Sequence, residues 1–383
     1  MDLIKRFFPM QQQSFFLFGP RGTGKSTLMH TTYPHALSID LLDPQLLRSL
    51  SARPESLSDI IAGNSTVGVV IIDEIQKVPA LLSVVHALIE KNKKITYILT
   101  GSSARKIKRA GVDLLAGRAL LKQLHPFMAA ELGEHFSLEH ALTFGLIPVV
   151  FGAADIKQSL QAYVGLYIKE EVQAEGLVRS LENFSRFLEV ISYSHAATLN
   201  VTNIARECEV KRKTVENYID ILEDLLLAFK LPMFTKRAQR SLSVHPKFYF
   251  FDAGVFRTLR PKGMLDRSEE IDGAALEGLV VQHLRAWNDY SIEKHELAFW
   301  RTRSGVEVDV IVYGPLGFWA IEVKNATKVH SQDTKPLETF LQDYPMAQGI
   351  LLYRGKQRLV QNNVLCIPCE EFLLHLQPNN PLI

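Results

Sequence analysis

The 383-residue sequence has few cysteines, no long apolar run and almost no net charge. Three cysteines are too few for a disulfide framework. No uninterrupted apolar run is long enough to span a bilayer, and residues 1–13 lack the apolar core and small-residue cleavage site of a secretion signal. We therefore expect a cytoplasmic protein that makes no use of a membrane.

Two of the cysteines, Cys366 and Cys369, form a single C-x-x-C pair. A structural zinc site needs a second Cys or His pair at suitable spacing, and the sequence offers none. We predict ordinary strand or turn residues here, with a redox or metal site as the alternative.

The net charge of +2 predicts no bulk attraction to nucleic acid or anionic lipid, so any basic surface must be local. Apolar residues make up 47% of the chain and charged residues 22%, a globular balance. The length exceeds what one hydrophobic core usually supports, which predicts two or three domains. No internal repeat is visible, which argues against a solenoid.

A glycine-rich segment, Gly19-Pro20-Arg21-Gly22-Thr23-Gly24-Lys25-Ser26, fits G-x-x-x-x-G-K-[ST] between an apolar strand and a helix-like stretch. In this pattern backbone N–H groups converge on phosphates at a helix N-terminus, the lysine reaches the β and γ phosphates, and the serine hydroxyl ligates Mg²⁺. A glycine-rich turn without a ligand is the alternative. The pattern predicts ATP and Mg²⁺ as ligands.

The run Val69-Val70-Ile71-Ile72-Asp73-Glu74 predicts a buried strand that ends in two acids. At the carboxyl edge of a parallel sheet these acids lie beside the P-loop. We expect Asp73 to hold Mg²⁺ and Glu74 to orient the attacking water. A surface acid pair is the alternative.

A third strand, at residues 95–99, leads into Thr100-Gly101-Ser102-Ser103, where a hydroxyl can sense the γ-phosphate. This series of strands resembles the AAA ATPase superfamily, in particular a bacterial and archaeal group with Ser-Ser-x-Arg and Ala-Gly-Arg after the third strand. Both occur here, as Ser102-Ser103-Ala104-Arg105 and Ala116-Gly117-Arg118. The predicted ATP-binding residues are Gly19, Pro20, Arg21, Gly22, Thr23, Gly24, Lys25, Ser26, Thr27, Asp73 and Ser102, with Ser26 and Asp73 as metal ligands.

In addition to the role of Glu74, the resemblance implies catalytic roles for two arginines. Arg105 would be a sensor and Arg118 a finger that reaches the γ-phosphate of a neighbouring subunit, although the two roles could be exchanged. A finger in trans implies a homo-oligomer, either a ring or an open hexamer. The alternative is a solvated basic face, because Lys and Arg crowd residues 105–122.

Residues 201–224 predict two helices of a helix-turn-helix, the second with Lys211, Arg212 and Lys213 near its start. A wing is expected to follow, and residues 230–262 hold eight Lys or Arg against one acid. This pattern predicts DNA binding through Lys211, Arg212, Lys213, Lys236, Arg237 and Arg240. Winged helices also bind proteins, which is the alternative, and the acidic second half of the second helix would repel phosphate.

Near the C-terminus, alternation along Val306-Glu307-Val308-Asp309-Val310 and Ala320-Ile321-Glu322-Val323-Lys324 places acids and a lysine on one face. With Glu277 on the preceding helix, Asp309, Glu322 and Lys324 resemble the PD-(D/E)XK nuclease superfamily. That resemblance covers about residues 270–370 and implies Mg²⁺ or Mn²⁺ held by the carboxylates, with the lysine positioning water or stabilising phosphate charge. Salt bridges on hairpins are the alternative.

The predicted fold class is therefore α/β. We expect an AAA-type parallel-sheet P-loop domain over residues 1–123, a helical lid over 124–195, a winged helix-turn-helix over 196–268, and a restriction-endonuclease-like α/β domain over 269–383. The expected function is an oligomeric ATPase that acts on DNA in repair, recombination or defence, possible actions being remodelling or translocation of branched or single-stranded DNA. The alternatives are an ATP-gated nuclease and a nucleotide-dependent switch that binds protein partners.

Overall fold

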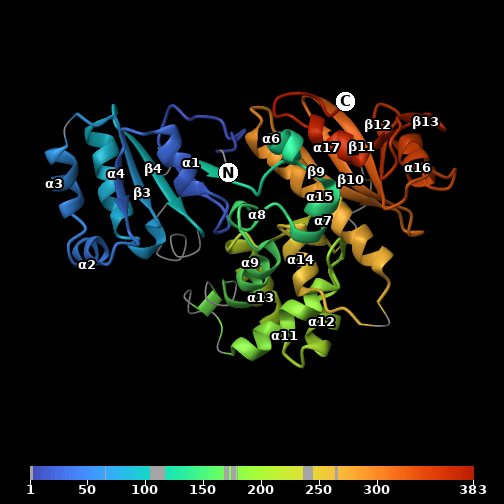
Figure 1. Ribbon diagram of the computed structural model, residues 1–383, viewed down its shortest axis with the longest axis horizontal. Coiled ribbons are helices and arrows are strands. Elements are labelled where there is room, and N and C mark those ends of the chain that lie inside the picture. The colour runs from blue at the N-terminus through green and yellow to red at the C-terminus, as the bar shows by residue number, and fades with distance from the viewer. Residues whose placement is uncertain are drawn as a thin grey trace. The chain divides into compact units, whose positions relative to one another are not determined.

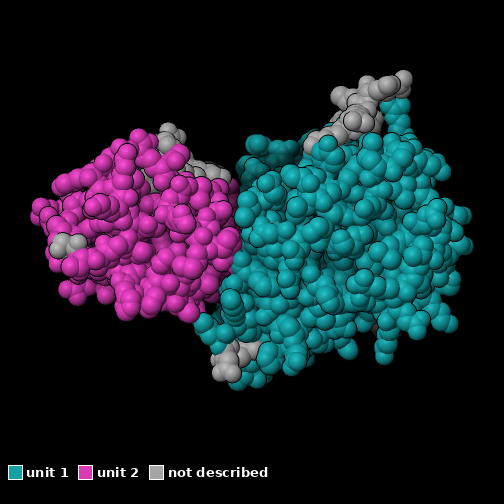
Figure 2. All heavy atoms as spheres, turned by 90° about the horizontal axis from the view of Figure 1, so that it is seen from above, with its two compact units in different colours: residues 1–7, 126–223, 227–383 teal, residues 8–125, 224–226 magenta. Residues whose placement is uncertain are grey.

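The computed structural model describes residues 3–64, 66–103, 117–167, 172–173, 178, 180–235, 245–263 and 266–383. The chain divides into two compact units, drawn in separate colours in Figure 2. Unit 2 contains Phe8–His125 and Asp224–Leu226, and unit 1 contains Met1–Phe7, Pro126–Glu223 and Leu227–Ile383. The predicted division into four domains stays a prediction.

Unit 2 is built on a five-stranded sheet in the order β2-β3-β4-β1-β5, and every neighbouring pair is parallel. The predicted parallel α/β architecture is confirmed. The strands are β1 (Phe15–Phe18), β2 (Leu37–Asp40), β3 (Val69–Asp73), β4 (Thr96–Gly101) and β5 (Leu120–Gln123). The helices are α1 (Lys25–Thr32), α2 (Pro44–Ala52), α3 (Ser56–Gly63) and α4 (Leu81–Lys91), with a 3₁₀ turn η1 (Ile75–Lys77).

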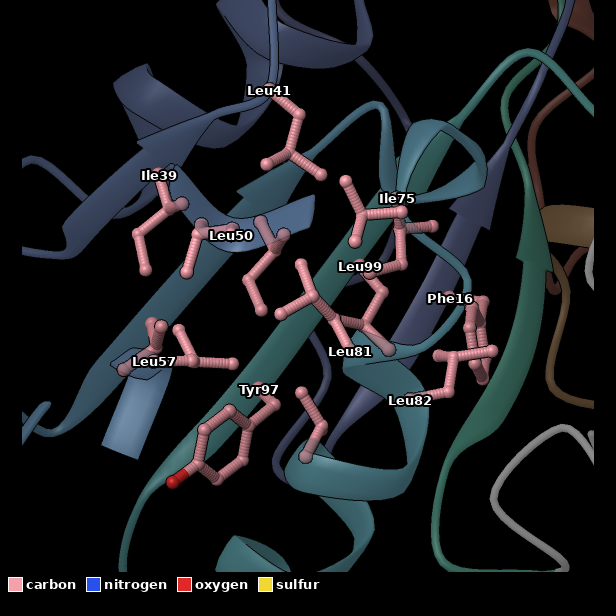
Figure 3. Packing of buried hydrophobic residues seen from close by; sticks show 14 of the residues in the cluster. Phe16, Ile39, Leu41, Leu50, Leu57, Ile75, Leu81, Leu82, Tyr97 and Leu99 are labelled. Carbon is pink, nitrogen blue, oxygen red and sulfur yellow. The ribbon is translucent and has the colours of Figure 1, made fainter. Parts of the chain in front are cut away.

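Apolar residues on the inner strands explain this sheet. All four residues of β1 are buried, as are the last four of β3, which is the pattern of strands covered on both faces. Figure 3 shows side chains from the strands and from α4 packing together, among them Phe16, Leu81, Leu82, Tyr97 and Leu99. This core fixes the positions of the strand ends that carry polar residues.

Within unit 1, the described residues between 129 and 192 are mainly helical. Its elements are α6 (Ala129–Leu132), η2 (Gly133–His135), α7 (Leu138–Phe144), α8 (Pro148–Phe151), α9 (Ile156–Ala162), a π-helical turn η3 (Tyr163–Tyr167) and α11 (Leu181–Ser192). In α11 the buried residues Phe184, Phe187, Leu188 and Ile191 form one apolar stripe along the helix.

A small antiparallel sheet follows, in the order β6-β8-β7. Its strands are β6 (Ala197–Thr198), β7 (Ala228–Leu231) and β8 (Lys247–Phe250), and the helices around it are α12 (Val201–Glu207), α13 (Arg212–Asp224) and α14 (Ala253–Leu259). Glu209, between α12 and α13, has a φ of 56°, and the N–H of Val210 donates to Ala205 O at 3.0 Å. The two helices are therefore joined by a tight turn.

The C-terminal part of unit 1 contains a mixed six-stranded sheet in the order β13-β14-β12-β11-β10-β9. Strands β9, β10 and β11 are antiparallel neighbours, whereas β11, β12 and β14 are parallel. The elements are α15 (Ser268–Tyr290), β9 (Glu296–Arg301), β10 (Glu307–Gly314), β11 (Gly317–Lys324), α16 (Lys335–Asp343), β12 (Gln348–Tyr353), β13 (Leu359–Gln361), β14 (Val364–Pro368) and α17 (Cys369–His375), most of them labelled in Figure 1.

Among the helices in the described ranges, none has the length and apolar character required to cross a bilayer.

Candidate functional sites

The glycine-rich loop lies between β1 and α1, at the carboxyl edge of the sheet in unit 2. Gly22 and Gly24 have φ values of 78° and 86°, in the left-handed region that a side chain would strain. The Thr23 hydroxyl donates to Pro20 O at 2.7 Å, and the Lys25 ammonium donates to Gly19 O at 2.8 Å and to Pro20 O at 3.2 Å. The lysine is therefore held across its own loop, at the N-terminus of α1.

Close packing explains why the loop begins with a glycine, Gly19. A Cβ atom at Gly19 would lie 2.5 Å from the carbonyl oxygen of Leu124, just after β5. The backbone at residue 19 thus packs directly against the chain that leaves the sheet.

Asp73, the last residue of β3, is buried and receives hydrogen bonds at both carboxylate oxygens. Ser26 Oγ donates to Oδ2 at 2.5 Å, the Thr100 hydroxyl donates to Oδ1, and the Glu74 N–H also donates to Oδ1 at 3.1 Å. The hydroxyl and carboxylate oxygens of Ser26 and Asp73 suit Mg²⁺, which prefers oxygen ligands. Because β4 lies between β3 and β1, the ends of three neighbouring strands form this site.

Glu74 follows Asp73 with a φ of 59°, a conformation that turns its side chain out of the strand direction. The Gln76 side-chain amide donates to Glu74 Oε2 and, at 3.2 Å, to Ser102 Oγ. A Cβ atom at Gly101 would collide with Gln76 Oε1, so glycine at the end of β4 leaves room for this amide. Gln76 was not among the predicted site residues, although it lies directly beside a predicted motif. Thr100 belongs to the segment in which a hydroxyl was predicted to sense the γ-phosphate, but it was not singled out.

Arg118 lies just before β5 and pairs with Glu90 of α4. In the parallel register Phe15 pairs with Leu120 and Phe18 with Gln123, so the residues before β5 and the P-loop after β1 lie at opposite edges of the sheet. Arg118 is therefore separated from the P-loop of its own unit by the length of a strand. Arg105, the predicted sensor, lies outside the described residues.

The basic residues predicted to bind DNA are exposed where the structure describes them. Lys211 directly precedes α13, and Arg212 and Lys213 begin it; both of these pair with Glu216, at 3.0 and 3.5 Å. The remaining three predicted residues, Lys236, Arg237 and Arg240, lie outside the described residues.

The structure brings the predicted nuclease residues together, around a lysine that was not predicted to belong to them. The Lys247 ammonium lies 2.9 Å from Glu277 Oε1, 2.7 Å from Glu307 Oε1 and 3.1 Å from Asp309 Oδ1. Lys247 had been counted in the basic excess of residues 230–262, and its buried position shows that it contributes nothing to a basic surface. We call these four residues, with Glu322 and Lys324, the acid cluster.

The remaining members of the acid cluster lie on β11. Glu322 Oε1 accepts a hydrogen bond from Lys324 at 2.7 Å, while its buried Oε2 has no hydrogen-bond partner. Asp309 Oδ2 accepts from the Val323 N–H at 3.0 Å, which joins β10 to β11. The pairing of β10 with β9 shifts register between Val308 and Ile311, and such irregularities redirect a side chain.

The charges in the acid cluster do not balance, because four carboxyl groups face two ammonium groups. Burial, and then Asp309, raises the pKa of Glu277 to about 7 and that of Glu322 to about 8. Burial alone would lower the pKa of Lys247, but Glu277 and Asp309 raise it well above its ordinary value. Lys247 therefore stays charged, and the excess negative charge is relieved by protonation of the buried acids.

In the part of the chain that is described, there is no group of three or more His, Cys, Asp or Glu side chains placed to hold an ion, and this includes the acid cluster, where Lys247 lies among the carboxylates. Cys366 lies in β14 and Cys369 begins α17, and both thiols are buried. Burial raises the pKa of Cys369 to about 12, which leaves its thiol un-ionised at neutral pH.

Three family comparisons match successive parts of the chain. Residues 11–133 match an AAA domain, residues 135–266 match a domain of unknown function (DUF8612), and residues 272–372 match a second domain of unknown function (DUF4143). Together with the parallel sheet and the P-loop, the first match defines an AAA-type, ATP-binding P-loop ATPase domain. The predicted ATPase domain is confirmed at this level.

Two mycobacterial proteins resemble nearly the whole chain. Uncharacterized protein Mb2031c of Mycobacterium bovis and Uncharacterized protein Rv2008c of Mycobacterium tuberculosis are each 25% identical over 374 residues, which cover 93% of this chain and 80% of theirs.

Solved structures of DnaA align with part of the chain. AMPPCP-bound DnaA from Aquifex aeolicus aligns with 55% of this chain and 81% of its own, at 14% identity and a TM-score of 0.26. The replication initiator DnaA bound to AMPPCP and single-stranded DNA aligns with 55% and 82%, at 12% identity and a TM-score of 0.26.

Proposed function

We propose that this chain is an oligomeric ATP hydrolase that acts on DNA. The observation that carries the ATPase part is the buried Asp73 carboxylate, which contacts Ser26 of the P-loop and Thr100 of β4 at the same time. These contacts tie the phosphate-binding loop to the two strands that carry the other polar residues of the site.

Each residue of the site has a role in hydrolysis that follows from its chemistry. The Lys25 ammonium and the N–H groups at the start of α1 bind phosphate charge, and Ser26 and Asp73 would hold Mg²⁺, which neutralises phosphate oxygens when bound. The carboxylate oxygens of Glu74 can accept a hydrogen bond from water. Gln76, fixed against Gly101 and Ser102, restricts where the Glu74 carboxylate can lie.

The position of Arg118 supports an oligomer. An arginine at the edge opposite the P-loop cannot serve the nucleotide of its own subunit, but it can serve that of a neighbour stacked against this edge. The pair with Glu90 would then hold the side chain in place in the free subunit.

The helices α12 and α13 support the DNA part of the proposal. Two helices joined by a tight turn and followed by an antiparallel β7–β8 pair have the order of a winged helix-turn-helix. The apolar face of α13, which includes Val215, Tyr218 and Leu222, is buried, and this leaves Lys211, Arg212 and Lys213 exposed at its start.

A metal-dependent nuclease activity is the second candidate, because Glu277, Asp309, Glu322 and Lys324 converge in the order helix, strand, strand expected for a PD-(D/E)XK domain. The same geometry also suits a platform that binds a partner without cleaving it.

The test measures ATP hydrolysis by the full chain with and without single-stranded, duplex and branched DNA. We expect DNA to stimulate turnover, Lys25→Ala to lose tight ATP binding, and Glu74→Gln to keep ATP binding but lose turnover. Unchanged turnover in Glu74→Gln would remove this residue from catalysis. DNA binding without a steep salt dependence would refute the role of the basic residues. Cleavage of DNA with Mn²⁺, abolished by Asp309→Asn, would establish the second candidate.

A further inference from the structure

The acid cluster has a cation of its own, supplied by the chain. Three carboxylates from α15 and β10 point at one ammonium group, with oxygen–nitrogen distances between 2.7 and 3.1 Å. The Lys247 side chain is 1% exposed and its partners Glu277 and Asp309 are 13% exposed, so solvent screens these two contacts only weakly, whereas Glu307 is 27% exposed. The Lys247 ammonium therefore lies at the point on which the three carboxylates converge.

The contacts around Lys247 fix the side chain in that position. Tyr249, two residues along β8, donates its hydroxyl to the same Glu277 oxygen at 2.6 Å. The Phe299 ring lies 5.8 Å from the ammonium, a distance at which a ring face attracts a cation. β8 itself is the central strand of the small sheet and pairs with β6 and β7. Lys247 therefore links that sheet to α15 and β10.

We propose that the Lys247 ammonium occupies the position that a divalent cation would take among Glu277, Glu307 and Asp309, so that the lysine and a metal ion compete for the same carboxylates. A divalent ion and an ammonium both draw carboxylate oxygens to one point, at about 2.1 Å for Mg²⁺ or Mn²⁺ and about 2.8 Å for N⁺–H···O⁻. In this conformation the acid cluster is closed to metal. A metal ion can enter the acid cluster only if the Lys247 ammonium leaves this position. Because Lys247 lies in β8, a movement of the small sheet would open the cluster.

Glu322 shows that the cluster has unused capacity for a cation. Its buried Oε2 has no hydrogen-bond partner, although Lys324 satisfies the other oxygen. A buried acceptor without a partner is costly. The cluster therefore keeps one buried acceptor that neither Lys247 nor Lys324 satisfies.

The experiment measures Mn²⁺ binding to the full chain, by electron paramagnetic resonance of free Mn²⁺ and without nucleotide. It compares the wild type with Lys247→Met, which keeps an unbranched side chain, one atom shorter, and removes its charge. Lys324→Met is the matched control, because it removes an ammonium from the rim of the same cluster. The double variant Lys247→Met/Asp309→Asn locates the site.

We expect the wild type to show no Mn²⁺ site that depends on Asp309. Lys247→Met should gain one, at least about tenfold tighter than any binding by the wild type, and the double variant should lose this gain. Lys324→Met should leave the affinity close to that of the wild type. Without metal, Lys247→Met should melt at a lower temperature, and Mn²⁺ should restore the loss, because the ion replaces the missing positive charge.

Either of two results would overturn the proposal. One is a wild-type Mn²⁺ site that Asp309→Asn abolishes, which needs no Lys247 variant to fold. The other is a Lys247→Met chain that binds no more Mn²⁺ than the wild type. If Lys247→Met is insoluble, Lys247→Gln, which removes the charge but keeps a polar side chain and all the carboxylates, gives the same comparison. The readout is metal binding without DNA or nucleotide, so it is measured separately from DNA cleavage and from ATP hydrolysis.

Discussion

The buried imidazole of His283 should make the stability of unit 1 sensitive to acid. His283 is 1% exposed on α15, its Nδ1 contacts Leu279 O at 2.8 Å, and its Nε2 accepts a hydrogen bond from the Ala129 N–H at 2.9 Å. Because Leu279 O only accepts, Nδ1 carries the proton and Nε2 is bare. A second proton, on Nε2, would point at the Ala129 N–H that now donates to this atom. Burial lowers the pKa of His283 to about 4.

The sign and size of the effect follow from linkage. The pKa is lower in the folded than in the unfolded chain, so the contribution is complete above about pH 6.5 and is lost as the pH falls toward 4. A shift of about 2.5 units, at about 1.4 kcal/mol per unit, amounts to about 3 kcal/mol. Buried Glu277 and Glu322, whose pKa values are raised, change the stability in the opposite direction, so only a comparison of variants isolates the histidine.

The assay is urea unfolding at a series of pH values, followed by tryptophan fluorescence. The three tryptophans, Trp287, Trp300 and Trp319, all belong to unit 1, so the signal reports on that unit. His283→Gln should be less stable than the wild type at pH 7, and the difference should shrink by about 3 kcal/mol by pH 4. His375→Gln is the control, because His375 makes the same contact to the carbonyl four residues earlier but is exposed. A wild-type-minus-His283→Gln difference that does not vary with pH would refute this reasoning.

Two further predictions concern the ATPase site. Gly101→Ala should displace Gln76 and with it Glu74, lowering turnover about tenfold while costing about 1–3 kcal/mol of stability and leaving ATP affinity nearly unchanged. Gly63→Ala, where an added Cβ meets nothing within 4 Å, is the control, and normal turnover in Gly101→Ala would show that Gln76 does not position Glu74. Inactive Arg118→Ala subunits mixed with inactive Lys25→Ala subunits should regain ATPase activity, because one interface can combine an intact finger with an intact P-loop. An inactive mixture, with mixed assembly demonstrated, would argue against a finger in trans.

The nucleotide site could largely be predicted from the sequence because its residues are tied to short local patterns. An apolar strand followed at once by glycines and Lys25, or by Asp73, specifies both the element and the edge of the sheet. The edge strands β2 and β5 were not predicted, since each has only four residues and exposes part of its length. The role of Gln76 depends on the space left by Gly101, which is 25 positions away in the chain.

The acid cluster shows the limit of the same reasoning. Alternation along β10 and β11 brought Glu307, Asp309 and Glu322 to attention, but the sign of the charge on Lys247 suggested a surface that binds DNA. Its burial depends on acids 30 and 62 residues away, contributed by α15 and β10. No local pattern contains that information, because a lysine between aromatic residues on a strand looks the same whether its partner is a phosphate or a carboxylate.

The N-terminal residues have a consequence for how the two units are connected. The Phe7 N–H donates to Glu131 Oε1 at 2.6 Å, and Arg6 contacts Glu131 Oε2 at 3.0 Å and Pro126 O at 3.3 Å. Unit 2 begins at residue 8 and its main segment ends at residue 125, so the chain leaves unit 1 and returns to it at neighbouring points. In terms of connectivity the nucleotide-binding unit is an insertion, with the short segment Asp224–Leu226 as its one addition from elsewhere. A protein organised in this way can gain, lose or exchange its ATPase without any change in the path of the rest of the chain.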